Sequence, residues 1–443
     1  MVRSSGIAAI LGAALVCVLG AREAAASGFA IRENSAEALG TAFAGNASSA
    51  DFLSTIFNNP AGMTEFTGDR GQVDASLIVP SDKFSGGATE TCGSCPPAGT
   101  TPIGGNNGGD AGKTGFIPAL YALHSFSPDL KFGLAITVPF GLKTQYSSLW
   151  VGRYFGIKSE VESIDINPNI AYRVNDWLSV GGGISANYLY ADLTKAVDLN
   201  AILGFPPGSV PDGHARFNGA DWNWGYNAGL LLKPLPGTNV GIAFRSRIQH
   251  KLQGDQNFTG VPPLPPFANS PGRVSLNLPA NVDVSVTHKI TDQLHISADV
   301  QWTQWSSVQQ LVVIRDSGSP VAGSLISTHF RDTVFASVGA TYNIDEHWTV
   351  RAGVAYDESP VTDGFRTVQL PDADRYWLAF GGGYKFSEGF SVDVGYAHIF
   401  IPGSPSLSSS VNSTLTLPGG VDKLRGSYSA SVDLISLQAR YKF

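Results

Sequence analysis

The sequence is poor in charge and has no long apolar run after its first residues. Charged residues make up 15% of the 443 residues, and the formal net charge of −7 is spread along the chain. It contains no basic cluster of the kind that binds nucleic acid, so we expect no nucleic-acid partner. Beyond residue 26 there is no stretch of about 18 apolar residues, which excludes a membrane-spanning helix.

Cysteine is scarce as well. Cys17 lies in an apolar leader, and the two others, Cys92 and Cys95, lie in a loop rich in glycine, proline and threonine. A zinc site needs about four ligands, and no second pair is present. A redox motif would be expected beside a βαβ unit, which this sequence lacks. We therefore expect Cys92 and Cys95 to form a small loop disulfide in an oxidising compartment, and we expect no metal or cofactor.

Residues 1–26 have the pattern of a secretory signal peptide. Arg3 supplies a positive end, residues 7–19 form an apolar core, and Ala24-Ala25-Ala26 provide small residues for cleavage before Ser27. Export from the cytoplasm follows from this pattern.

From Gly71 onward, apolar and polar residues alternate with period 2. In Leu294–Thr303, for example, Leu, Ile, Ala, Val and Trp alternate with polar residues, and Trp348–Asp357 has the same pattern. Such segments match the roughly 9–11 residues with which an oblique strand crosses a bilayer. With few charges and 10% aromatic residues, the alternation predicts a transmembrane β-barrel.

Short and long connections alternate strictly between these segments. Outer-membrane barrels have short periplasmic turns and long external loops. The pattern predicts an all-β fold of about 14 antiparallel strands, in the bacterial outer membrane, with both chain ends on the periplasmic side. The short connections are 127–129, 175–176, 235–237, 291–292, 345–346 and 387–388, and the long ones are 85–115, 147–156, 196–216, 258–272, 316–324, 359–369 and 411–423.

The last strand ends on an aromatic residue. Leu437, Ala439, Tyr441 and Phe443 share one face. A terminal aromatic with period-2 apolar residues resembles the assembly signal of bacterial outer-membrane proteins. We therefore expect the barrel assembly machinery as a partner, and outer-membrane lipid and lipopolysaccharide around the barrel.

The segment from Ser27 to Phe66 does not have a strand pattern. It is rich in small residues, has Phe52 and Ile56 at helical spacing, and should leave the helix before Pro60. It is either an arm on the surface or a plug inside the barrel. We favour the plug, and expect a signal peptide over 1–26, a partly helical hatch over 27–70 and a transmembrane barrel over 71–443.

Pro139 interrupts what is otherwise a regular third strand. Proline cannot donate a ladder hydrogen bond, and unpaired backbone groups are costly against lipid. The break is either an edge kink or an opening that another segment fills. We expect the hatch to touch it, so the predicted lateral opening comprises Asn59, Pro60, Ala61, Pro139, Phe140 and Gly141.

Two of the expected external loops are unusually apolar. One contains Trp150, and the other contains Ile202, Leu203 and Phe205. Exposed apolar patches tend to mark binding sites, so we predict that these residues capture a hydrophobic ligand. Packing of the loops against each other is an equal alternative.

In these features the chain resembles the FadL/TodX family of outer-membrane transporters for long-chain fatty acids and other hydrophobic compounds. The resemblance implies a fourteen-stranded barrel closed by an N-terminal hatch, an apolar groove in the loops, an inner pocket, and a third-strand kink that opens the wall sideways. It rests on Gly28-Phe29, Asn59-Pro60-Ala61 and the stretches 136–142, 222–229, 276–279, 302–311, 357–361 and 371–377.

The resemblance also implies a ligand path. Asp357 matches a lumen aspartate of the family, whose pocket uses basic residues to meet the ligand carboxylate. This chain has Tyr190 and a residue near Ile326 at the expected basic positions, and Lys195, Arg315 or Arg331 are candidate substitutes. The predicted path comprises Tyr190, Lys195, Arg351 and Asp357.

The predicted function is passive uptake of long-chain fatty acids or other hydrophobic compounds, with capture by the loops and lateral release at the kink. The alternatives are an aromatic or aliphatic hydrocarbon transporter of the same family, or a general porin. A porin should begin its strands almost at once, which residues 27–66 do not do. No catalytic constellation is present, so we do not expect an enzyme.

Overall fold

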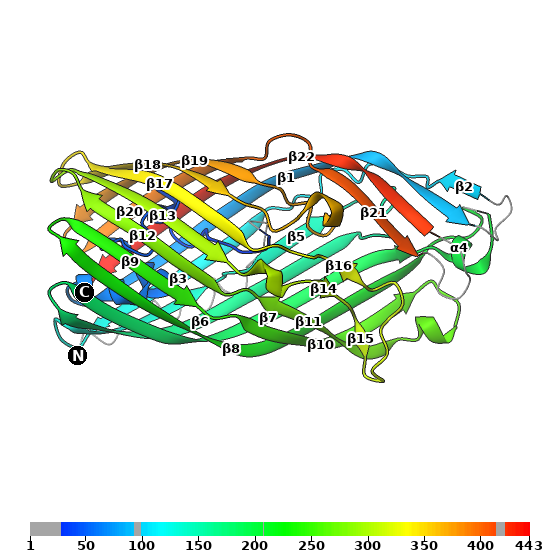
Figure 1. Cartoon of the computed structure of the whole chain (residues 1–443), viewed down its shortest axis with the longest axis horizontal. Helices are drawn as coiled ribbons and strands as arrows, with labels where there is room; N and C mark the ends of the chain where they lie inside the picture. Colours follow the sequence, from blue (N-terminus) through cyan, green and yellow to red (C-terminus); the bar gives the residue numbers. More distant parts are fainter. Residues whose placement is uncertain (1–27, 93–98, 207, 413–420) are drawn as a thin grey trace.

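The computed structural model describes residues 28–92, 99–206, 208–412 and 421–443, whose strands form one closed wall (Figure 1). Fourteen antiparallel strands surround the barrel axis, and β1 closes the wall against β22, from Arg70 opposite Lys442 to Thr91 opposite Val421. The barrel predicted from the alternation is confirmed. The expected signal peptide, Cys95 and the side chain of Cys92 lie outside the described part, so the signal peptide and the disulfide stay predictions.

Three wall strands are interrupted and carry two labels each: β4 with β5, β9 with β10, and β11 with β12. The wall consists of β1 (Arg70–Cys92), β3 (Gly115–Ser125), β4 (Leu130–Thr137), β5 (Gly141–Gln145), β6 (Lys158–Asn175), β7 (Leu178–Val197), β8 (Gly213–Leu235), β9 (Thr238–Arg245), β10 (Ile248–Thr259), β11 (Ser270–Leu278), β12 (Asn281–Lys289), β13 (Leu294–Thr303), β17 (Thr333–Asn343), β18 (Trp348–Asp357), β19 (Arg375–Ser387), β20 (Phe390–Phe400) and β22 (Val421–Lys442).

Shorter elements lie in the loops and inside the barrel. The short strands are β2 (Gly99–Pro102), β14 (Gln310–Leu311), β15 (Ile314–Arg315), β16 (Ile326–Ser327) and β21 (Ser406–Asn412). The helices are α2 (Ala36–Gly40), α3 (Thr55–Asn58), α4 (Leu199–Leu203) and the 3₁₀ turns η1 (Pro60–Glu65), η2 (Pro265–Phe267), η3 (Trp305–Ser307) and η4 (Asp363–Phe365).

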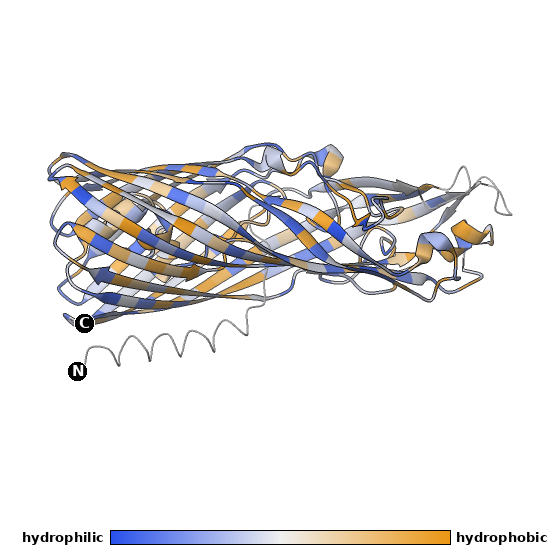
Figure 2. Ribbon diagram, turned by 90° about the horizontal axis from the view of Figure 1, so that it is seen from below, coloured by the Kyte–Doolittle hydropathy of each residue, from blue (hydrophilic) through white to orange (hydrophobic). Residues whose placement is uncertain are grey.

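The outer face of the wall is apolar. On β13, Ile296, Val300 and Trp302 point outward and are exposed, whereas Asp299 points inward and is buried. The same alternation appears around the barrel as apolar and polar bands in Figure 2. Apolar side chains exposed in this regular manner face lipid rather than water. No helix in the described part of the chain is long and apolar enough to cross a membrane.

The two ends of the barrel differ. Short turns and the C-terminus lie at the left end of Figure 1, which is therefore the periplasmic end, and the long loops lie at the right. The wall is taller on one side, because β1 and β8 have 23 residues each whereas β18 has 10. The outer parts of the long strands therefore project beyond the apolar belt.

Residues 28–69, which we call the hatch, lie inside the barrel (Figure 1). Ala38 and Leu39 of α2, Ile56 of α3 and Met63 of η1 are fully buried. The side chain of Ser35 caps α2 by accepting from Ala38 N–H at 3.4 Å. The helix predicted around Ile56 ends at Asn58, and Pro60 begins η1.

The hatch touches the wall backbone directly at wall glycines. A methyl group at Gly353 would overlap the Thr41 carbonyl, one at Gly241 would overlap Ala47, and one at Gly229 would overlap Asn59. Glycine weakens a strand, but it lets another backbone approach closely. The hatch can therefore fill the lumen only because the wall has glycine at these positions.

We predict that Gly353→Val loosens the hatch without unfolding the barrel. Overpacking of this kind costs about 1–3 kcal/mol. Residues 28–69 should then be cleaved faster by protease, while the heat-dependent gel shift of the folded barrel persists. Gly382→Val is the matched control, because the nearest atom to a methyl group there is Thr349 O at 3.9 Å. Equal cleavage rates in the two variants would refute the close contact.

Candidate functional site

The third wall strand is broken at Pro139, and the start of the hatch fills the break. β4 ends with Thr137 opposite Asp165, and β5 resumes with Gly141 opposite Glu162. Ile31 N–H donates to Pro139 O at 2.8 Å, and Gly141 N–H donates to Phe29 O at 2.8 Å. The broken ladder is therefore completed from inside the barrel.

Asn59-Pro60-Ala61 lies elsewhere, so its expected contact with the kink is wrong. Asn59 Nδ2 donates to Leu230 O of β8 at 2.9 Å, and Pro60 and Ala61 lie against Gly181 of β7. The side chain of Asn59 both donates to this wall carbonyl and caps η1, and the two interactions together fix Asn59 against β8. The proline showed where the wall breaks but not which segment fills the break. The sequence signal for the segment that fills the break is the short apolar stretch Gly28-Phe29-Ala30-Ile31 at the beginning of the hatch.

An aromatic cluster lies behind the break. The ring centroids of Phe29 and Trp305 are 4.7 Å apart, those of Phe29 and Phe140 are 5.9 Å apart, and those of Trp305 and Phe330 are 6.0 Å apart. Leu142 and other buried apolar residues complete this cluster. The break is therefore backed by packed apolar side chains.

The hatch is also attached at Gly28. Gly28 N–H donates to Asp372 Oδ2 at 3.0 Å. The same carboxylate accepts from Ser359 Oγ at 2.8 Å and pairs with Arg375 at 2.7 Å. Burial raises the pKa of Asp372, and the positive charge of Arg375 opposes this rise. Asp357, a predicted ligand-path residue, is buried at the end of β18 opposite Arg375, and so lies close to this attachment.

An apolar pocket surrounds Lys195 at the outer end of the barrel. Its walls come from β7, β8 and the loop that contains β14 to β16. Lys195 Nζ donates to Gly323 O at 2.5 Å, and among the residues that the structure describes it has no carboxylate within ion-pair distance. The apolar lining includes Leu193, Phe217, Val313, Leu325 and Ile326, and an adjoining hollow adds Ile202, Phe258, Phe267 and Val321.

The other candidate bases are already engaged. Arg315 donates to Pro266 O at 2.7 Å and Ala268 O at 2.8 Å. Arg331 pairs with Glu358 at 3.0 Å. Of the three substitutes named from the sequence, Lys195 alone lines the pocket that also contains Ile326.

Tyr190 does not face the lumen, which corrects its place in the predicted path. Its neighbours Leu189 and Ala191 are buried and point inward. Because successive side chains of a strand point to opposite faces, Tyr190 points outward, where it interacts with Arg216.

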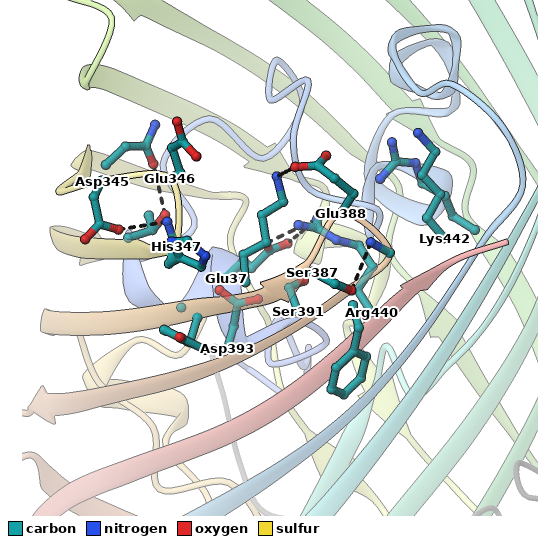
Figure 3. A pocket seen from close by; sticks show the side chains of 18 of the residues that line it. Glu37, Asp345, Glu346, His347, Ser387, Glu388, Ser391, Asp393, Arg440 and Lys442 are labelled. Atoms are coloured by element: carbon teal, nitrogen blue, oxygen red, sulfur yellow. Dashed lines mark hydrogen bonds and ion pairs between the residues drawn. The ribbon is translucent and has the colours of Figure 1, made fainter.

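Arg351 lines a hollow at the periplasmic end of the barrel, into which Glu37 of the hatch and Asp393 also point (Figure 3). It pairs with Asp393 at 2.8 Å and with Glu37 of α2 at 3.5 Å, and Arg440 pairs with Glu37 at 3.2 Å. Arg351 and Lys195 are therefore at opposite ends of the barrel, and the four predicted ligand-path residues do not form one site.

The predicted capture residues divide into two groups. Trp150 is fully buried, stacks on Tyr146 with 4.0 Å between ring centroids, and donates from Nε1 to Gly156 O at 2.8 Å. It packs the loops together, which corrects its expected exposure. Leu203 and Phe205 are 40% and 44% exposed, and Ile202 is buried beneath them. The loop with α4 therefore presents the expected apolar surface, whereas the loop with Trp150 exposes Leu149 but buries its other large apolar side chains.

Comparison with known proteins agrees with this architecture. A family model described as "Outer membrane protein transport protein (OMPP1/FadL/TodX)" matches residues 17–443. The long-chain fatty acid transport protein of Shigella flexneri is 30% identical over 370 residues, which cover 75% of this chain and 82% of that protein.

Solved structures agree as well. The crystal structure of a Pseudomonas aeruginosa FadL homologue has a TM-score of 0.83 at 26% identity, and the match covers 94% of this chain and 100% of that one. The Ralstonia pickettii toluene transporter TbuX shares the fold, with a TM-score of 0.62 at 21% identity over 93% of this chain and 99% of that one. The chain belongs to the OMPP1/FadL/TodX family of outer-membrane transport proteins.

Proposed function

We propose that this protein is a passive outer-membrane channel for long-chain fatty acids. The pocket around Lys195 receives the carboxylate, the apolar lining receives the tail, and the ligand leaves sideways through the break at Pro139. The long-chain fatty acid transport protein named above supports this substrate class.

The observation that carries the proposal is the ammonium group of Lys195 in an apolar pocket. Its only hydrogen-bond acceptor in the described residues is the Gly323 carbonyl. Lys195 is half-buried, and a charge-assisted hydrogen bond to a carboxylate is stronger than the bond to an uncharged carbonyl that it now makes. A fatty acid supplies both the missing charge and an apolar tail.

The break at Pro139 supports a lateral exit. Two backbone hydrogen bonds join residues 29–31 to the wall there. Each buried methylene contributes about 0.8 kcal/mol, so a tail of about sixteen carbons favours an apolar environment by on the order of 10 kcal/mol. An exit past the aromatic cluster into the bilayer avoids exposing the tail to periplasmic water.

A neutral hydrocarbon is the second candidate ligand. The apolar side chain of Ile326 lines the pocket near the position where the family resemblance leads us to expect a base. A ligand without a carboxylate would use the same lining and leave Lys195 bound to Gly323 O.

The C-terminal strand and the outer face suggest the remaining partners. Leu437 and Tyr441 of β22 and the following Phe443 are exposed on the outer face of the barrel. We infer that the barrel assembly machinery recognises these C-terminal residues. Outer-membrane lipid and lipopolysaccharide cover the apolar belt in the assembled protein.

We predict that Lys195→Met weakens oleate binding about 10- to 100-fold, because a charge-assisted hydrogen bond contributes about 1.5–3 kcal/mol. Toluene binding should not change. Displacement of a fluorescent fatty acid from the detergent-solubilised protein measures the affinities for oleate and for toluene. Lys251→Met, at an exposed site on β10, is the control. Unchanged oleate affinity in Lys195→Met would exclude the carboxylate site and favour the neutral ligand.

We also predict that a disulfide between Ala30→Cys and Phe140→Cys stops uptake. These residues form an antiparallel bridge, and residues directly opposite in a non-hydrogen-bonded pair have Cα atoms about 4.5 Å apart. Labelled oleate uptake into liposomes should be lost on oxidation and return on reduction. The two single-cysteine variants should not respond. Uptake by the oxidised double variant would contradict exit through the break.

A small labelled sugar tests the porin alternative in the same liposomes. We expect oleate to enter and the sugar to remain outside, because the hatch fills the lumen. Entry of the sugar without oleate would overturn the proposed function.

A further inference from the structure

Three carboxylates converge at the outer end of the barrel. They are Glu90 of β1, Asp422 of β22 and Asp198, which precedes α4. One oxygen from each lies within 4.8 Å of the others, and the three residues are 2%, 1% and 5% exposed, respectively. None of them belongs to the pairs that hold the hatch.

The fold forces these carboxylates together. Glu90 and Asp422 are direct partners across the β1–β22 closure, and both point inward. Like charges directly opposite on a sheet are destabilising. Asp198 comes from a different part of the chain, and its Oδ1 accepts from Asn200 N–H at 3.0 Å and Ala201 N–H at 3.1 Å. These caps fix the carboxylate through Oδ1 and leave Oδ2 outside the helix cap.

A second observation points to a missing ligand. Glu90 Oε1 and Asp198 Oδ2 are buried and accept no hydrogen bond from the described residues. A buried acceptor without a partner loses its hydration and gains nothing in return.

Two cations lie nearby, and both have other partners. Arg153 attracts Asp198, but its guanidinium pairs with Asp212 at 2.6 Å. Lys195 attracts Asp422 from beyond ion-pair distance while it donates to Gly323 O.

We propose that Glu90, Asp198 and Asp422 bind one divalent cation, with Ca²⁺ preferred. The three ligands are carboxylates, which suit hard cations rather than zinc or copper. Ca²⁺ accepts irregular sets of six to eight oxygens at about 2.3–2.6 Å, whereas Mg²⁺ requires a near-ideal octahedron. The site lies beyond the apolar belt, on the side of the external loops, where waters complete the coordination.

The cation has a structural consequence. It links the closure of the barrel to the loop with α4, whose Leu203 and Phe205 are exposed. It also neutralises Asp422, which lines the same hollow as Lys195 and Ile202. The effect on ligand binding rests on the proposed function, whereas cation binding does not.

Calorimetric titration of the full-length protein with CaCl₂ in detergent tests the site. We expect one Ca²⁺ per chain, with a Kd of about 10⁻⁴–10⁻³ M, as in extracellular modules. Glu90→Gln and Asp198→Asn should each weaken binding at least about tenfold, because one of the three charged ligands is lost. Asp316→Asn, at an exposed position on another external loop, should bind Ca²⁺ as the unaltered protein does. Absence of saturable binding, or equal affinity in all variants, would overturn the proposal.

A second readout does not depend on the folding of variants. In the unaltered protein, Ca²⁺ should slow proteolysis of the loop with α4 relative to EGTA, and MgCl₂ should protect it less. Equal cleavage with Ca²⁺ and EGTA would refute the site. Oleate binding measured in EGTA separates the two proposals. Normal oleate binding without any effect of Ca²⁺ on proteolysis or in the titration would reject the cation site and leave the proposed function intact.

Discussion

Backbone groups in hydrocarbon must be paired, and the rest of this structure depends on that constraint. A closed wall satisfies it along its paired strands, but the third strand is broken at Pro139, and a proline has no N–H to offer. The chain meets the exception with Phe29 and Ile31, which bind Gly141 and Pro139 from the lumen. A segment can do this only if it is held inside the barrel, so the break and the hatch require each other.

The two ends of the hatch are held by different interactions. Near the periplasm, Glu37 pairs with Arg351 and Arg440. Removing one partner of a buried ion pair costs about 3–5 kcal/mol, so this end is firmly anchored. At the break, ordinary backbone hydrogen bonds contribute about 0.5–1.5 kcal/mol each. The backbone hydrogen bonds at the break are therefore weaker, one by one, than the ion pairs that hold α2 near the periplasm.

Period-2 alternation and turn spacing were sufficient to predict the barrel, because each is a local property of the chain. The location of the break was equally local, since Pro139 alone imposes it. Contacts across the lumen are not local properties of the chain, so they could not be predicted. Nothing near Asn59 in sequence shows that its amide donates to Leu230 O. Tyr190 was misplaced because a shift of one residue reverses the face of a strand. The burial of Trp150 could not be predicted, because it packs against segments far away in sequence. The choice of Lys195 among the three candidate bases also needed the structure, which shows that Arg315 and Arg331 already have other partners.

The closure of the break is independent of side-chain identity. Both hydrogen bonds between residues 29–31 and the wall join main-chain atoms. Substitutions at Phe29 or Ile31 can therefore change the packing of the apolar clusters behind the break while both main-chain hydrogen bonds are kept. The side chains at this position are thus free to vary without opening the wall.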